Sequence, residues 1–230
     1  MNFLCHAIPY MQSPWSAAAT AVPDWLSVVD RKIRARSRFA IPHLDSDDPT
    51  LAAVAKGIVA HHDDDRWFHG GEAFVQTNLE FAVQLRDLLQ KVDGEKEAGF
   101  RPTFVGHILI EMLLDKFWLE DHPHLGRDYY KMLGEISPEE IERCVNIITG
   151  KPTDMLAPTI RRFHETKFLL DYLDDQKLLR RLNQVMNRVG LAVLPDALLD
   201  WFPDAQEQVR RKRDMMLTPP GASSPFPLES

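Results

Sequence analysis

Apolar residues recur three and four positions apart through most of the chain, which is the spacing of one face of an α-helix. No segment shows a convincing alternation of apolar and polar residues, as a half-buried strand would. One all-α domain is therefore expected over residues 1–217, and the Pro- and Ser-rich segment 218–230 is expected to be a disordered tail. The pattern predicts helices over 51–68, 73–92, 101–119, 137–148, 158–173, 175–190 and 195–217, and a shorter one over 15–30 that Pro23 breaks.

Capping residues mark several of these boundaries. Asp48, followed by a proline, is typical of a helix N-cap. Ser137 and Glu140 form a capping box at the start of a later helix. Between the helices, we expect residues 121–124 to be a loop with solvent-exposed histidines and the basic run 31–38 to be a solvated helix face.

Composition and charge limit the function classes. The chain has 230 residues, of which 44% are hydrophobic, so it can bury one sizeable core. Its formal net charge of −7 argues against nucleic acid as the main partner, because phosphate binding requires a basic surface. No apolar run reaches the roughly 20 residues of a membrane span. The N-terminal residues do not resemble a secretory signal, and two cysteines make no disulfide framework, so we expect a cytoplasmic protein. The sequence does not indicate its oligomeric state.

The segment Gly57–His69 concentrates ionisable residues, with three histidines and three consecutive aspartates in thirteen residues. On a helix, His61, Asp65 and His69 stand four residues apart and share one face, with neighbouring Cβ atoms roughly 5–6 Å apart. Imidazole and carboxylate groups at that spacing are common ligands of zinc, manganese or iron. The alternative is a helix end whose polar residues are simply solvated.

A second stripe lies on the most apolar helix, 101–119. His107, Glu111 and Asp115 follow one another at four-residue spacing among apolar side chains, so each needs a partner in the interior. The first stripe is the leading candidate for that partner, because helical bundles build metal sites from facing helices. A structural ladder of salt bridges is the alternative.

Two further candidates lie nearer the N-terminus. His6 is a lone histidine in an apolar segment, where a satisfied core residue is more common than a ligand. Asp24 stands among apolar residues next to Trp25. Because an unpaired buried charge is costly, Asp24 must be an N-cap, part of an ion pair, or a metal ligand. Composition and spacing leave these alternatives open.

Short motifs occur in a consistent order over most of the chain. They are M-N-F-L-x-H at residues 1–6, the acid in P-D-W-L at 23–26, G-I-x-x-H-x-x-x-D at 57–65, the His- and Trp-bearing helix at 107–118, and the run from F-L-L-D-Y-L to N-R at 168–188. Together they resemble the acyl carrier protein phosphodiesterases, a divergent all-helical branch of the HD-type metal-dependent phosphohydrolases.

This resemblance implies an HD-type helical bundle that hydrolyses the phosphodiester between 4′-phosphopantetheine and an acyl carrier protein, or a related phosphoester. Another phosphopantetheine-bearing protein is an alternative partner, and the expected cofactor is a divalent metal, manganese first, with iron or zinc as alternatives. The site residues that the resemblance implies are His6, Asp24, His61, Asp65 and His107. We expect these residues to bind one or two divalent ions, with Glu111 or His69 completing the shell. The chain departs from the family pattern beside these positions, at Ala18–Ala21, Asp64, Phe68-His69 and Gly106.

The remaining roles are hypotheses that accompany the resemblance. His62 and Asp63 match the His-Asp doublet that names the HD class and are candidates for general acid or base, and His69 is a further catalytic candidate. The candidates for holding phosphate oxygens are Arg66, Lys116 and Arg188. Two other classes stay open. One is a catalytically inactive helical binding protein that docks an acidic partner such as a carrier protein, and the other is a helical di-iron oxidase, whose Glu-x-x-His pairs are missing here.

Overall fold

The computed structural model describes residues 1–93 and 100–222, and over these ranges the protein is a single all-α domain without strands. The α-helices are α1 (Phe3–Ala7), α2 (Pro14–Ala19), α3 (Val22–Val29), α4 (Ser37–Ala40), α5 (Pro49–Gly70), α6 (Glu72–Asp93), α7 (Pro102–Asp121), α8 (Pro123–Glu135), α9 (Pro138–Thr149), α10 (Leu156–Thr166), α11 (Asp175–Arg188) and α12 (Leu198–Leu217). Three short 3₁₀ helices are η1 (Ile8–Tyr10), η2 (Ile41–His43) and η3 (Phe168–Leu173).

Predicted caps start two of these helices. The Asp48 carboxylate accepts hydrogen bonds from the backbone N–H groups of Thr50 and Leu51, at 3.0 and 3.2 Å, and so begins α5. The Ser137 hydroxyl accepts from the Glu140 N–H at 3.2 Å and begins α9. Both predictions from the sequence are confirmed.

Three predictions of local structure were wrong. Residues 123–135 form α8 where a loop was expected to begin, because Pro123 occupies the first turn, where its missing N–H costs nothing. The helix expected over 158–173 ends at Thr166, since Lys167 has a left-handed backbone (φ 45°), and continues only as η3. The basic run 31–38 is extended backbone and turns, apart from its last residues in α4.

The C-terminal prediction is tested only in part. The last helix, α12, ends at Leu217, at the boundary predicted for the helical domain. Residues 218–222 form a bend and a turn, and residues 223–230 of the expected tail lie outside the described residues. Among the helices that are described, none has the length and apolarity to cross a membrane.

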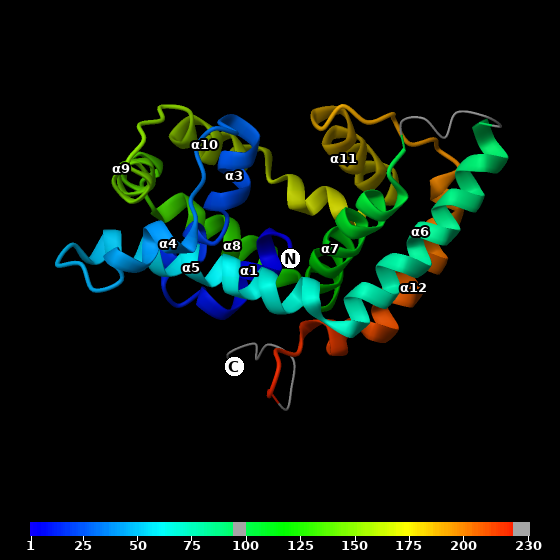
Figure 1. The fold of residues 1–230 in the computed structure, drawn as a ribbon, viewed down its shortest axis with the longest axis horizontal. Helices are drawn as coiled ribbons and strands as arrows, with labels where there is room; N and C mark the ends of the chain where they lie inside the picture. Colours follow the sequence, from blue (N-terminus) through cyan, green and yellow to red (C-terminus); the bar gives the residue numbers. More distant parts are fainter. Residues whose placement is uncertain (94–99, 223–230) are drawn as a thin grey trace.

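The helices pack around one continuous core with α1 at its centre. Figure 1 shows α1 between α5 and α7, with α6 and α12 side by side along one edge and α3, α9 and α10 at the opposite end. The N-terminus is therefore interior, and Met1 is only 3% exposed. This arrangement brings the two helices that carry the predicted stripes, α5 and α7, to either side of the first residues of the chain.

Close contact between α2 and α5 depends on Gly57. A Cβ at this position would lie 2.2 Å from the backbone oxygen of Ser16 and 2.7 Å from the Ala19 Cβ, closer than real atoms approach. Glycine therefore lets the two helices touch through their backbones. Because α3 follows α2 directly, this contact also places Asp24 beside α5.

Candidate metal centre

The position of α1 is set by a carboxylate from α7. Asp115 is fully buried and accepts hydrogen bonds from the backbone N–H groups of Leu4 and Cys5, at 3.1 and 2.9 Å. These are first-turn donors of α1 that no other group in the helix can satisfy. Burial raises the pKa of Asp115 to about 6 despite these hydrogen bonds. Asp115 thus holds His6 in place and does not join His107 and Glu111, as the stripe on α7 suggested.

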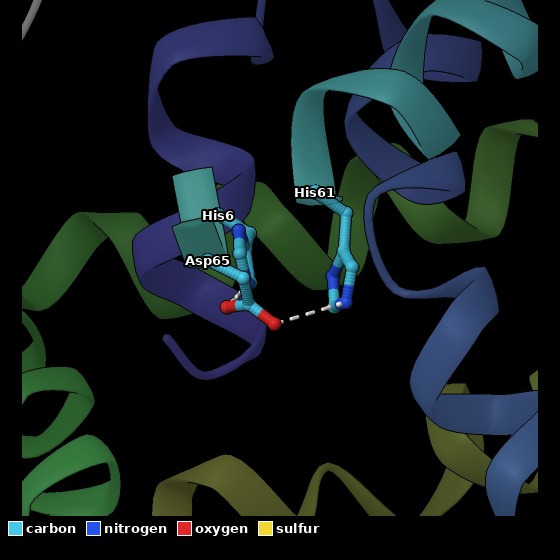
Figure 2. A group of neighbouring side chains, drawn as sticks. All are labelled: His6, His61 and Asp65. Atoms are coloured by element: carbon cyan, nitrogen blue, oxygen red, sulfur yellow. Dashed lines mark ion pairs between the residues drawn. The ribbon is translucent and has the colours of Figure 1, made fainter. Parts of the chain in front are cut away.

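His6, His61 and Asp65 form the first candidate metal group. The Asp65 carboxylate approaches a nitrogen of each imidazole, with Oδ1 3.2 Å from His6 Nε2 and Oδ2 3.5 Å from His61 Nε2 (Figure 2). The ring centroids of the two histidines are 4.4 Å apart. One ligand atom from each residue lies within 4.8 Å of the others, which is compact enough for all three to reach one cation.

The hydrogen-bonding state of these imidazoles fits a metal site. His6 Nε2 and His61 Nδ1 are buried without a hydrogen-bond partner among the described residues, and the short approach of His6 to Asp65 lacks hydrogen-bond geometry. Buried polar atoms are rarely left in this state, because desolvation without a new partner is costly. Two imidazoles and a carboxylate are also the donor types that zinc, iron and manganese accept.

Asp64 contacts the second ring nitrogen of His6. It is buried, and one of its oxygens lies 3.5 Å from His6 Nδ1, on the opposite side of the ring from Asp65. Metal-binding histidines usually direct their second nitrogen at such a carboxylate, which fixes the ring and its tautomer. The sequence contained a signal for this role, because position 64 follows His61 by three residues and so shares its face of α5.

His69, His107 and Glu111 form the second candidate group. Oε1 of Glu111 lies 2.8 Å from His69 Nε2 and 3.1 Å from His107 Nε2, and the ring centroids of the histidines are 4.5 Å apart. The three residues are half-buried, and their ligand atoms also lie within 4.8 Å of one another. His69 comes from α5 and the other two from α7, so the predicted meeting of the two stripes is confirmed for these residues.

The ammonium group of Met1 lies between the two groups. It contacts Asp65 Oδ1 at 2.6 Å and Glu111 Oε1 at 3.2 Å, so these two oxygens are at most about 6 Å apart. Burial alone would lower the pKa of this amine, but Glu111 and Asp65 outweigh it and raise the pKa to about 10. Both groups therefore face one interior point, and that point already attracts a cation.

The protonation states also suit a divalent cation. Burial and the neighbouring His6 hold the pKa of His61 well below its ordinary value, which leaves its ring neutral at neutral pH. Burial opposes ionisation of Asp65 and Glu111, yet the surrounding histidines and the Met1 ammonium keep both pKa values low. Neutral imidazoles and ionised carboxylates are the forms that bind metal, so no proton has to leave these three residues first. His6 differs, because burial lowers its pKa but Asp64 and Asp65 raise it on balance, so a metal at this ring would displace a proton.

Asp24 is the remaining acid near both groups. It lies in the first turn of α3, whose N-cap is Ala21, so the N-cap alternative for Asp24 was wrong. Its carboxylate makes no hydrogen bond or ion pair with another described residue. Burial raises the pKa of Asp24 to about 7, His6 lowers it, and Glu111 and Asp65 raise it further. These couplings place Asp24 within electrostatic reach of both groups.

Other residues proposed from the sequence lie outside the two groups. His62 Nε2 approaches the backbone oxygen of Ala35 at 2.6 Å, and Lys116 is buried in an ion pair with Asp175 at 2.6 Å. Asp63 and Arg66 form an exposed ion pair with each other at 2.8 Å. The structure therefore does not bring His62, Asp63, Arg66 or Lys116 to the metal groups, whereas it places His69 within one of them.

Comparison with known proteins adds no further constraint. The chain matches no family model, no curated protein and no solved structure. The likeness to acyl carrier protein phosphodiesterases therefore remains an expectation from short motifs.

Proposed function

We propose that the protein is a metal-dependent phosphodiester hydrolase that holds one divalent ion at each of the two groups. The observation that carries this proposal is the convergence of four imidazoles and two carboxylates, from α1, α5 and α7, on one interior point. The two orphaned nitrogens of His6 and His61 support it, because a metal would give them the partner they lack. Asp24 is the unpaired carboxylate available to complete the coordination.

The residues divide the work of such a site. Divalent ions bound there would lower the pKa of a coordinated water toward about 7 and offset charge on a phosphoryl oxygen. His6 and His61 supply buried imidazole nitrogens, while Asp65 and Glu111 supply the negative charge that retains a cation. Asp64 and Asp115 act by position, since the first orients the His6 ring and the second fixes the helix that carries it.

The substrate class is proposed from the motifs. A phosphodiester of the 4′-phosphopantetheine type, carried on an acyl carrier protein or a related protein, is what the family resemblance implies, and manganese is the first metal to test. The geometry itself supports the coarser part of this proposal, an oxygen- and nitrogen-ligated divalent cation at a site with ionised carboxylates.

Metal content and turnover test the proposal together. Purified protein loaded with manganese and desalted should contain about two ions per chain by element-resolved mass spectrometry, and it should hydrolyse bis-p-nitrophenyl phosphate. His61→Ala and His107→Ala should each lose about one ion and most activity, whereas His62→Ala, on the same helix but outside both groups, should keep both. Metal-free wild type, or undiminished metal in both of the first two variants, would contradict the proposal.

A second candidate is a helical binding protein that retains the scaffold without catalysis. It is favoured by one observation, the run of exposed basic residues at 31–38, none of which forms an ion pair with an acidic side chain in the described part of the chain. Fully metal-loaded protein that turns over neither bis-p-nitrophenyl phosphate nor a phosphopantetheinylated carrier protein would favour this candidate over the hydrolase.

A further inference from the structure

Helix α6 exposes a stripe of apolar side chains to solvent. Val75, Leu79 and Val83 are 42%, 58% and 55% exposed, and their four-residue spacing places all three on one face of the helix. Within the described ranges, every other α-helix of eight or more residues exposes at most one large apolar side chain, as α9 does at Ile147. Single exposed residues of this kind are ordinary on a protein surface, whereas a contiguous row is typical of an interaction site.

The stripe lies on the side of α6 that points away from the core. Phe74, Phe81 and Leu85, on the opposite side of the helix, are at most 3% exposed. Figure 1 shows α6 along an edge of the molecule with α12 beside it. Between these two helices, Lys212 Nζ binds Glu80 Oε2 at 2.9 Å, so α12 covers one flank of α6 and leaves the stripe exposed.

Charged residues follow the stripe at both of its ends. Glu72 precedes Val75 by three residues, Arg86 follows Val83 by three, and both charged side chains are exposed. Each stands seven residues from Leu79, which is about two helical turns, so both share its face of α6. This face therefore reads acid, apolar, apolar, apolar, base, with Leu79 at its centre.

This order of residues is complementary to its own reverse. In an antiparallel pair of α6 helices with a two-fold axis at Leu79, Leu79 meets its own copy and Val75 meets Val83 of the partner subunit. Glu72 then lies opposite Arg86 of the partner subunit, and the axis repeats each contact. A guanidinium has five N–H donors, so this pairing does not require Arg86 to be free of contacts within its own chain. A parallel pair would instead bring like charges together at each end, which is unfavourable.

We propose that α6 is a dimer interface, at which two copies of this chain pair their α6 helices antiparallel about Leu79. The self-complementary order of apolar and charged residues identifies a second copy as the occupant. From Glu72 to Arg86 the helix is about 21 Å long, which makes a small interface, so we expect a weak dimer with a micromolar dissociation constant. The inference is independent of the proposed hydrolase, because the side of α6 that approaches His107 is the opposite one, at Phe74.

Sedimentation-velocity ultracentrifugation of the full-length protein in EDTA tests the interface. Wild type should shift from monomer to dimer as its concentration rises from about 1 to about 200 µM. Leu79→Lys places two ammonium groups opposite each other at the axis, so this variant should stay monomeric throughout. Ile147→Lys is the matched control, since it puts the same charge on an exposed apolar position of another helix, and it should dimerise as wild type does.

Two outcomes of this experiment would overturn the proposal. One is a wild type that remains monomeric up to the highest concentration, which would assign the stripe to a different partner. The other is a Leu79→Lys variant that dimerises as well as the control. Both substituted positions are exposed, so the variants should fold, and urea unfolding checks that they do.

Exchange of the flanking charges tests the antiparallel arrangement. Glu72→Arg and Arg86→Glu each set like charges against one another across the axis and should each weaken the dimer by about threefold or more. The double variant Glu72→Arg/Arg86→Glu restores both pairs with reversed polarity, so its dissociation constant should return to within about twofold of the wild-type value. A double variant that dimerises no better than the single variants would overturn the antiparallel pairing about Leu79.

Discussion

At the scale of single residues, adjacent aspartates on α5 have opposite roles. Asp64 is buried behind His6, while Asp63 is exposed and pairs with Arg66. Asp64→Asn keeps the shape of the side chain but weakens its hold on the His6 ring, so we expect metal affinity to fall about 10- to 100-fold. Asp63→Asn should leave it within about twofold. Competition with a fluorescent chelator measures both, and equal affinities in the two variants would remove Asp64 from the centre.

The buried Asp115 predicts a pH dependence of stability. Its pKa is 3.8 when the chain is unfolded and about 6 when folded, so its favourable contribution is complete below pH 3.8 and lost as pH rises through about 6. This difference corresponds to about 3 kcal/mol. In EDTA, wild type should therefore lose stability relative to Asp115→Asn between about pH 4 and 7.5, measured by urea unfolding. If the free energies of unfolding of the two proteins change with pH in parallel, ionisation of Asp115 does not lower the stability of the folded protein.

Residue patterns predicted part of the centre and missed part of it. Spacing on α5 and α7 placed His61, His69, His107 and Glu111 on facing stripes, because helical periodicity fixes which side chains share a face. The bond from Asp115 to α1 joins residues more than one hundred positions apart, and no local pattern records it. The ion pairs of the Met1 ammonium with Asp65 and Glu111 could not be predicted either, since they depend on Met1 lying in the interior of the fold.

At the scale of elements, the backbone contact between α2 and α5 predicts strong sensitivity to a methyl group. Gly57→Ala would force the two helices apart, because the added Cβ meets a backbone oxygen that cannot turn aside. We expect a loss of at least about 2 kcal/mol in the free energy of unfolding. Since α5 also carries His61 and α2 leads to Asp24, metal affinity should fall as well.

Gly70→Ala is the control for this prediction. It lies on the same helix, and a Cβ there would meet no atom within 4 Å. We expect a change within about 1 kcal/mol, in the stabilising direction that helix propensity favours. Urea unfolding of both variants decides the matter, and similar stabilities would show that the helices can separate at little cost.

Helix boundaries were predicted correctly where a capping residue and the apolar periodicity agreed. They were predicted wrongly where the backbone conformation of one residue ended the helix. Asp48 and Ser137 indicated helix starts because each side chain accepts a hydrogen bond from a backbone N–H two or three residues later. The left-handed turn at Lys167 has no such signal, because residues other than glycine rarely adopt positive φ.

At the scale of the whole molecule, metal binding should appear as stability. Ions that bind only the folded chain add about 2.7 kcal/mol each at one hundred times their dissociation constant. Since two ions are proposed, EDTA should then lower the Tm of a protein of this size by roughly 10–20 °C. A His61→Ala/His107→Ala double variant should show no such shift in differential scanning fluorimetry. A shift in that variant as large as in wild type would mean that the stabilising ions bind elsewhere.

The attachment of α1 to α7 also has a consequence for biosynthesis. The backbone N–H of Leu4 donates to Asp115, which follows it by 111 residues in the chain. Helix α1 therefore leaves the ribosome long before the carboxylate that holds it in position. During that interval its apolar side chains are unburied and His6 has no fixed place, which makes early fragments vulnerable to aggregation and to chaperone capture. His6 can therefore take its place beside His61 and Asp65 only after α7 has been translated, because Asp115 on α7 holds α1 in position. If the candidate metal groups bind ions, we expect binding to begin late in synthesis, when these distant segments have come together.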